Sequence, residues 1–347
     1  MRSGSICLGL VAALALSLAP SAPAQSCAGD LTGDGRIDGT DLGLMLSAWG
    51  PCTSCPADVN ANGIVDGADL GIQLLNWGDC AATPAWATLV DAHPDPSVVT
   101  DPALRAAIIA TGLAWRVRDT STQVEMLLVP PGTFHMGCVM GSQGYACPSS
   151  EQPVHEVTLT GAYYLGRYEV TQSQWQARMG SNPSSFQGPL FPDSASLPVE
   201  RVSWNTVRGY LLATGFRLPT EAEWEHACRA GTETPFPNGS TDDATVDEFA
   251  WHSTNSGSRT RPVGGKAANA LGFHDMAGNV AEWVSDWHDG YSAAAQSNPT
   301  GPATGTNRVV RGGAWTSSSY ALRSSARTPI APGDWYSSLG FRVARNP

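Results

Sequence analysis

The sequence is poor in charge, and above all in positive charge. It has 20 Lys and Arg against 31 Asp and Glu, which gives a net charge of −11 at pH 7. Nucleic acids are bound by clustered Lys and Arg, so this balance argues against a nucleic-acid partner and suits a protein that binds cations. After residue 18, no apolar run approaches the length of a membrane span.

The motifs of common hydrolases are missing as well. The seven His residues stand singly and no HExxH pair occurs, so the sequence gives no support for a zinc or iron site of that type. No Gly-x-Ser-x-Gly segment occurs, which removes one familiar setting of a serine nucleophile. The abundance of Trp (12), Gly (37) and Pro (25) among 347 residues instead predicts a loop-rich globular chain with few long helices.

Residues 1–24 have the pattern of a secretory signal peptide. Arg2 provides the charged start, residues 6–18 an apolar run, and Ala22-Pro23-Ala24 a cleavage site of small residues. Anchoring as a lipoprotein through Cys27 has weaker support, because the usual Leu does not precede it. We therefore expect an exported protein, cleaved near Ala24, whose cysteines lie where disulfides persist.

Residues 27–52 and 55–80 form a tandem repeat with a constant offset of 28 residues. Cys27, Asp30, Trp49 and Cys52 recur as Cys55, Asp58, Trp77 and Cys80. Each copy holds a twelve-residue calcium-loop pattern, with oxygen donors at alternating positions and a glycine at the sixth (Gly35 and Gly63). The predicted ligands of the first loop are Asp30, Thr32, Asp34, the carbonyl of Arg36, Asp38 and Asp41. Those of the second are Asp58, Asn60, Asn62, the carbonyl of Ile64, Asp66 and Asp69.

Apolar residues at helical spacing follow each loop, namely Leu42, Met45, Leu46 and Trp49, and then Leu70, Leu74 and Trp77. The repeat pair thus resembles the dockerin module, a small all-α unit of two EF-hand-like loops that binds calcium and docks onto cohesin domains. It departs from dockerins at loop positions 10 and 11, where the Ser/Thr recognition pair is replaced by Gly39-Thr40 and Gly67-Ala68. The resemblance implies calcium binding and raises the hypothesis of a cohesin-like or other extracellular partner. Repeat symmetry favours Cys27–Cys52 and Cys55–Cys80 disulfides, with crossed pairing left open.

Residues 81–114 are expected to be a Pro- and Ala-rich linker with one short helix, capped by Asp101 and ending near Gly112. Beyond it the sequence predicts short strands over 126–137 and 155–166, then a helix capped by Thr171. Two helices are expected within 197–231, the second beginning with a Thr220/Glu223 capping box. A loop leading into a short aromatic helix is expected over 261–287, and a hairpin and a closing strand near the C-terminus.

Blocks of residues 115–347 resemble the formylglycine-generating enzyme and sulfatase-modifying-factor family. The matching segments are PPGTFHMG, EVTQSQW, PVERVSWNTV, GFRLPTEAEWEHACRAGT, NALGFHDMAGNVAEWVSDW, RVVRGGAW and GFRVAR, in the family's order. The resemblance implies an α+β, C-type-lectin-like fold with little regular structure and stabilising calcium. It places one calcium ion on Asp275, the carbonyls of Gly278 and Val280, and Glu282. A second family calcium site cannot be matched to residues here.

The same resemblance draws attention to absent thiols. Family members that oxidise a sulfatase cysteine to formylglycine hold copper(I) on two cysteines after the Gly-Gly-Ser-Trp hairpin. Here Ser317 occupies the first position and Ser319 occupies or adjoins the second. Serine does not bind this soft ion or exchange disulfides, which argues against a copper cofactor. Cys138 and Cys147 are expected to form a local disulfide. Cys228 is expected to be a buried free thiol, because its usual partner position holds Ser324.

These observations favour a secreted calcium-binding protein whose larger domain binds a peptide or another ligand and has no catalytic residues assigned. The alternative is a formylglycine-generating oxidase with displaced thiols. A third hypothesis is a component of an envelope or extracellular assembly. Arg311, Arg323 and Arg327 are expected to pair with buried acids, and the serines around them to belong to the scaffold.

Overall fold

The computed structural model describes residues 28–32, 36–52, 55–138 and 146–347. The chain divides into two compact units, residues 1–80 and residues 81–347. Among the described residues, no helix is both long and apolar enough to cross a membrane. The boundary after Cys80 coincides with the end of the tandem repeat, and each unit is described separately below.

The smaller unit contains one helix for each repeat. Helices α1 (Gly39–Ser47) and α2 (Gly67–Leu75) both begin with a capping box, formed by Asp38 with Asp41 and by Asp66 with Asp69. Two antiparallel pairs of two-residue strands flank the helices: β1 (Arg36–Ile37) with β4 (Gly78–Asp79), and β2 (Gly50–Pro51) with β3 (Ile64–Val65). The unit is therefore not purely helical, because residues at the loop ends pair as short ladders.

The apolar face expected on these helices is only partly buried. Met45 is fully buried and packs with Ala57 and Val65. Leu46, Trp49, Leu74 and Trp77 remain 44–52% exposed. The reason is size: nine-residue helices around a core this small cannot cover every apolar side chain of the repeat.

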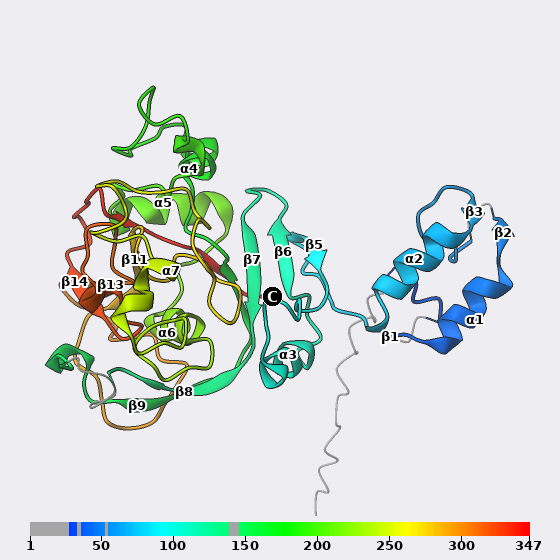
Figure 1. Ribbon diagram of the computed structural model, residues 1–347, viewed down its shortest axis with the longest axis horizontal. Coiled ribbons are helices and arrows are strands. Elements are labelled where there is room, and N and C mark those ends of the chain that lie inside the picture. Colours follow the sequence, from blue (N-terminus) through cyan, green and yellow to red (C-terminus); the bar gives the residue numbers. More distant parts are fainter. Residues whose placement is uncertain (1–27, 33–35, 53–54, 139–145) are drawn as a thin grey trace, which may run out of the picture. The chain divides into compact units, whose positions relative to one another are not determined.

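The larger unit is built on a five-stranded antiparallel sheet in the order β16-β10-β7-β6-β5 (Figure 1). Its strands are β5 (Ala87–Asp91), β6 (Arg116–Asp119), β7 (Glu125–Val129), β10 (Tyr163–Gly166) and β16 (Ala344–Arg345). Residues 81–114 are thus not a free linker. The expected helix is present as α3 (Pro102–Ile109) with Asp101 as its cap, but β5 joins the sheet and Trp86 packs edge-on against Tyr164.

A four-stranded sheet in the order β14-β13-β11-β15 forms the second layer. It contains β11 (Ala281–Trp287), β13 (Arg308–Arg311), β14 (Arg327–Ile330) and the parallel strand β15 (Leu339–Gly340). Residues 281–287 were expected to be helical and are a strand. The helical prediction failed because four of the seven residues are buried in this sheet, where Glu282 and Trp283 pair with Arg311 and Val310.

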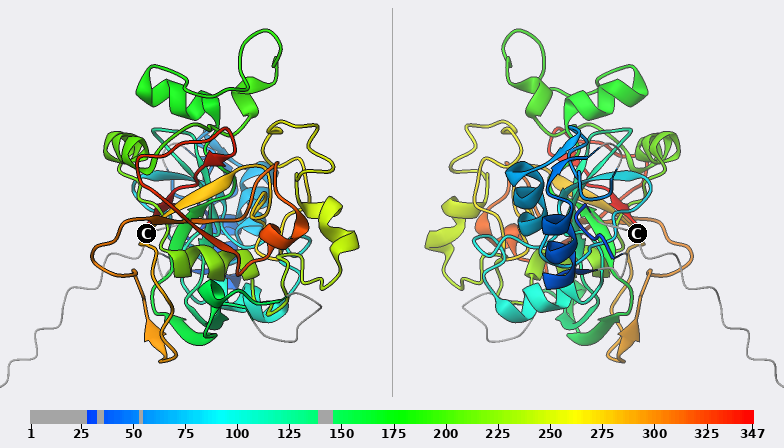
Figure 2. Two further views of the ribbon diagram at one scale, coloured as in Figure 1. Left: turned by 90° about the vertical axis from the view of Figure 1, so that its left-hand side faces the viewer. Right: turned by 90° about the vertical axis from the view of Figure 1, so that its right-hand side faces the viewer.

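A third sheet joins β8 (Gly132–Met136), β9 (His155–Leu159) and β12 (Gln296–Ser297). Besides α3, the α-helices in the described part of the larger unit are α4 (Gln172–Met179), α5 (Trp204–Thr214), α6 (Glu221–Arg229) and the short α7 (Val246–Phe249). The predicted caps at Thr171 and Thr220 are both present. Helix α4 and the loop after it stand out from the body of this unit (Figure 2). The mixed helix and sheet content confirms the α+β expectation for this part.

Candidate functional site

The serine-rich segment after Trp315 forms a compact turn between β13 and β14. The Oγ of Ser317 accepts a hydrogen bond from the backbone N–H of Ala314 at 2.9 Å, and the backbone N–H of Ser317 donates to the Ala314 carbonyl at 2.9 Å. The Oγ of Ser319 donates to the Asp243 carboxylate at 3.1 Å. Both hydroxyls therefore serve the local structure, as expected for scaffold residues.

An aromatic surface lies along the same segment, and it consists of Phe186, Trp315, Trp335 and Tyr336. The rings of Phe186 and Trp315 meet edge-on with centroids 5.6 Å apart. The indole of Trp315 donates to the carbonyl of Ser337 at 3.0 Å, next to Tyr336. Trp335 and Tyr336 are about half exposed, and the guanidinium of Arg201 lies 4.4 Å from the Trp335 ring centroid.

Cys228 is the free cysteine among the described residues, and it is fully buried in α6. Its Sγ lies 3.5 Å from the Oγ of Ser324, which is the partner position that the family resemblance indicated. Burial raises the pKa of the Cys228 thiol to about 11. Its position confirms the expected buried free thiol, and a protonated thiol is a poor nucleophile and a poor metal ligand.

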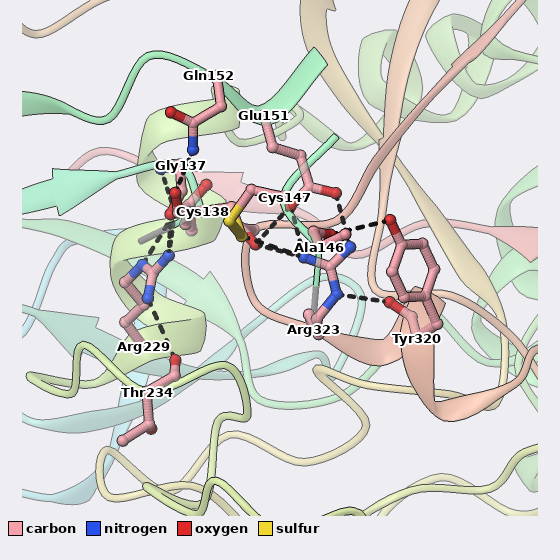
Figure 3. Close-up of a disulfide and its surroundings, with 12 residues drawn as sticks. Gly137, Cys138, Ala146, Cys147, Glu151, Gln152, Arg229, Thr234, Tyr320 and Arg323 are labelled. Atoms are coloured by element: carbon pink, nitrogen blue, oxygen red, sulfur yellow. Dashed lines mark hydrogen bonds and ion pairs between the residues drawn. A yellow bond between two sulfur atoms is a disulfide. The ribbon is translucent and has the colours of Figure 1, made fainter. Parts of the chain in front are cut away.

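The serine segment is tied to a disulfide between Cys138 and Cys147, which confirms that predicted pairing (Figure 3). Arg323 makes a two-pronged ion pair with Glu151, at 2.7 and 2.8 Å, and one of its nitrogens lies 3.6 Å from the Cys138 sulfur. The hydroxyl of Tyr320 donates to the carbonyl of Ala146 at 3.2 Å. These contacts hold the turn after Trp315 against both ends of the disulfide.

A second buried network joins β13 and β14 to the start of α6. Arg311 pairs with Glu221 and with Glu225, and Arg327 pairs with Glu221 at 2.6 Å. Burial opposes ionisation of Glu225, but Arg229 and Arg311 outweigh it and lower the pKa of that carboxyl. All three arginines expected to pair with acids therefore do so, and none of them is left to bind an anionic ligand.

The predicted calcium ligands of the larger unit lie in a tight turn before β11. Asp275 is 2% exposed; its Oδ2 accepts from the N–H of Gly264, and its Oδ1 is buried without a hydrogen-bond partner. Glu282 is held by Arg342 through both oxygens, at 2.7 Å each, and also accepts from the indole of Trp224. At Gly278, with φ of +82°, a Cβ would lie 2.3 Å from the Trp251 carbonyl, so only glycine fits this turn.

Of the two predicted carboxylates, Asp275 has an oxygen without a hydrogen-bond partner, whereas Arg342 engages both oxygens of Glu282. Glu169, a third buried carboxylate, accepts from the N–H of Val280 and from the Asn279 side chain. Burial raises the pKa of Glu169 well above its ordinary value, and the charges of Asp275 and Glu282 add to that effect. Within the described ranges, no three His, Cys, Asp or Glu side chains converge as a metal site. An ion here would therefore need the predicted carbonyls of Gly278 and Val280 beside Asp275 and Glu282.

In the described parts of the two predicted loops, acidic side chains accept hydrogen bonds from backbone N–H groups of the same loop. In the second loop, Asp58 accepts from the N–H groups of Asn62 and Gly63, at 3.0 and 2.8 Å, and Asn62 accepts from that of Ile64. Asp69 accepts from the N–H groups of Asn60 and Asp66.

In the first loop, Asp41 accepts from the N–H groups of Leu31, Thr32 and Asp38, and Asp30 accepts from the Thr32 hydroxyl. Arg36 contributes to β1 through its backbone. Asp34 lies outside the described residues.

The favoured cysteine pairing of this unit is wrong. The structure joins Cys52 to Cys55, only three residues apart, and Cys80 is also in a disulfide. Cys27 lies outside the described residues. The repeat places Cys52 at the end of one copy and Cys55 at the start of the next. These two cysteines are close along the chain, and they pair with each other instead of with the partners that repeat symmetry favoured.

Residues 114–347 match the family described as Sulfatase-modifying factor enzyme 1-like domain. The chain belongs to this family. The formylglycine-generating enzyme of Bos taurus is 37% identical over 285 residues, which cover 65% of this chain and 75% of that protein. A Chlamydia caviae protein named serine/threonine-protein kinase pkn1 is 35% identical over 246 residues, 64% of this chain, but the match covers only 38% of its own length.

A solved structure of the family's fold also resembles the chain. Treponema denticola variable protein 1 superposes with a TM-score of 0.58 at 32% identity, covering 65% of this chain and 95% of that one. Sulfatase-modifying-factor-like domains thus occur in proteins with quite different names. The domain alone does not fix the activity, and the residues of each member must be read individually.

Sequence reasoning missed two buried acids of this sulfatase-modifying-factor-like domain, Glu169 and Glu200. Glu200 is fully buried; its Oε1 accepts from the N–H groups of Ser185 and Phe186, and its Oε2 has no partner. Burial raises the pKa of Glu200 to about 7. A lone acid in an otherwise apolar segment, as in Leu197-Pro-Val-Glu200, was the available signal. Glu200 positions the backbone beneath Phe186 of the aromatic surface.

A large cavity lies elsewhere. It has a volume of about 840 Å³ and is lined by α5 and by the strand ends of β9 and β10, including Trp204, Leu211, Leu212 and Phe216. Neither Ser317 nor Ser319 contributes to it. The segment with the family's thiol positions and this apolar cavity are therefore separate features.

Proposed function

We propose that the chain is an exported protein whose sulfatase-modifying-factor-like domain binds a peptide without oxidising it. The observation that carries this proposal is the hydroxyl of Ser317 at the position of the family's first thiol. That hydroxyl is engaged with the backbone of Ala314. A neutral alcohol neither holds copper(I) nor forms a mixed disulfide with a substrate cysteine.

Cys228 does not offer a replacement. It is fully buried beside Ser324, and the raised pKa of its thiol keeps it protonated at neutral pH. The thiols of Cys138 and Cys147 are consumed in their disulfide. A two-thiol copper centre would thus need large rearrangements of the larger unit.

The aromatic surface supports the binding part of the proposal. Trp335 and Tyr336 are 51% and 49% exposed on a segment that is otherwise anchored through Trp315. Rigid, exposed aromatic rings with an adjacent arginine are typical of sites that recognise protein chains. Arg201, stacked on Trp335, adds a donor for peptide carbonyls.

The experiment combines turnover and binding in one preparation. The purified chain, with its disulfides intact, is incubated with copper(I), oxygen and a peptide containing Cys-x-Pro-x-Arg, and mass spectrometry follows the cysteine. The Bos taurus formylglycine-generating enzyme serves as the active control. We expect no conversion, together with binding that Trp335→Ala weakens and Leu190→Ala, at a more exposed apolar position, does not. Formation of formylglycine would establish the alternative, an oxidase with displaced thiols.

We further infer that the two loops of the smaller unit bind calcium and that this unit contacts an extracellular partner. The hydrogen bonds of Asp58 and Asp69 around Gly63, whose φ is +88°, support a loop already folded for a cation. The exposed Trp49 and Trp77 support a docking role, for a cohesin-like domain or as part of an extracellular assembly. Pull-down with cohesin domains, with and without calcium, tests the partner directly.

A further inference from the structure

A second cavity of about 330 Å³ lies beside the N-terminus of α6 and the end of β11. Its walls are polar and apolar in about equal parts, and the apolar part includes Met136, Tyr291, Pro299 and Pro302. Acidic groups also line it, namely Glu221, Asp286 and Asp289, and the cation in its wall is Arg327. It is separate from the serine segment and from the predicted calcium ligands.

The charges of this cavity do not balance. Both oxygens of Glu221 are occupied, one by Arg311 and the hydroxyl of Tyr291, the other by Arg327. Arg327 is thereby neutralised and also donates to the carbonyl of Asp289. The charge of Glu221 is consequently not available to a ligand.

Asp286 is different, because it is 4% exposed and makes no ion pair with a described residue. Its Oδ2 accepts from the N–H of Glu221 at 3.0 Å and from the hydroxyl of Ser285 at 2.7 Å. Its Oδ1 makes no hydrogen bond within the described part of the chain. Arg308, whose charge acts on Asp286, is instead stacked between two Trp rings and bonded to the carbonyl of Ser285. A buried, uncompensated carboxylate is costly, so its retention in a cavity wall points to a ligand.

The chain also keeps space open beside that oxygen. Gly301 has a φ of +69°, and a Cβ at this position would lie 3.2 Å from the Oδ1 of Asp286. Glycine therefore leaves room next to the one carboxylate oxygen without a hydrogen bond. The opening faces a cavity whose other walls suit methylene groups.

We propose that this cavity binds a primary alkylammonium group, with Asp286 as its counter-ion and the apolar walls around its carbon chain. A carboxylate oxygen without a hydrogen bond, in a cavity with apolar side chains on part of its wall, suits an organic cation, whereas a metal ion needs several convergent oxygen donors. The same chemistry is carried by a free amine and by the side chain of a lysine in a peptide. The contrasting explanation is that Asp286 only caps the N-terminus of α6.

Calorimetry with three probes separates these cases on the wild-type chain, without relying on any variant. We expect n-butylammonium to bind at least ten-fold more tightly than n-butanol, which has the same carbon chain without the charge. N-acetyl-lysine methylamide distinguishes the sources: binding as tight as that of butylammonium indicates a lysine side chain, and weaker binding indicates a free amine. Equal affinities for butylammonium and butanol, or binding of neither, would overturn the proposal and leave Asp286 as a cap.

A variant pair then assigns the charge. Asp286→Asn keeps an oxygen that accepts from the N–H of Glu221 but removes the charge, and we expect it to lower butylammonium affinity at least ten-fold. Glu156→Gln makes the same change in net charge at an exposed position and should leave the affinity unaltered. Undiminished binding by a folded Asp286→Asn chain would contradict the assignment.

Discussion

The Sγ of Cys228 and the Oγ of Ser324 lie 3.5 Å apart, in a fully buried contact between α6 and the segment before β14. The family resemblance pairs these two positions as cysteines, and here only Cys228 has a sulfur atom. This relationship yields the first of the predictions below.

Ser324→Cys is expected to form a disulfide with Cys228 under oxidising conditions. The crosslink would close a long loop and stabilise the larger unit by roughly 2–4 kcal/mol. Thiol titration after denaturation should find one free thiol fewer than in the wild type, and the melting temperature should rise. Ser325→Cys, one residue on and bonded to Glu151 instead, is the matched control and should keep both thiols reduced.

Arg311→Met should be the most damaging single change near the serine segment. Arg311 is 1% exposed and pairs with both Glu221 and Glu225, so its removal leaves these buried carboxylates with one cation each, Arg327 and Arg229. We expect a loss of about 3–5 kcal/mol in the free energy of unfolding by urea. Arg118→Met removes an exposed ion pair with Glu125 and should cost less than about 1 kcal/mol. Comparable losses in the two variants would show that the buried ion pairs contribute no more to the free energy of unfolding than the exposed one.

Glu200 makes stability depend on pH. Burial raises its pKa in the folded chain to about 7, above the ordinary value of 4.5. Between these values the unfolded chain releases the proton while the folded chain keeps it, so stability contributed by this group falls as pH rises from about 4.5 to 7. Glu200→Gln cannot ionise and keeps the acceptor for Ser185 and Phe186.

The melting temperature of Glu200→Gln should therefore exceed that of the wild type by more at pH 8 than at pH 5. Glu156→Gln, at an exposed position, should show no such widening. A constant difference for Glu200→Gln across this range would mean that Glu200 ionises normally.

Calcium should bind to the smaller unit with two sites per chain, and further sites would belong to the larger unit. Asp69→Asn weakens the last position of the second loop and should reduce the calorimetric stoichiometry by one. Asp101→Asn, which alters a helix cap outside both loops, should leave the stoichiometry unchanged. If Asp69→Asn binds as many ions as the wild type, the loop pattern has been misassigned.

Local signals in the sequence predicted local structure well. The caps at Thr171 and Thr220 depend on residues three positions apart, and both were correct. The pairing of Cys138 with Cys147 was predictable because a short loop separates them.

Features that depend on distant residues were not predictable. Residues 281–287 look helical in isolation and become a strand only because β13 and β15 flank them. Glu169 contacts Asn279 and Val280 across 110 and 111 residues, and no spacing in the sequence announces such a contact. The partners in the buried ion pairs could not be predicted for the same reason, since Glu151 and Arg323 are 172 residues apart.

The contacts of strand β11 affect how the larger unit unfolds. At one end Glu282 holds Arg342 of the C-terminal segment, and at the other Asp286 holds the first turn of α6. If the C-terminal segment or the first turn of α6 opened locally, a carboxylate of β11 would stay buried without its partner. Local opening of either segment is therefore costly. The amide protons of this seven-residue strand should exchange with solvent only when the whole unit unfolds, which makes β11 its slowest-exchanging segment.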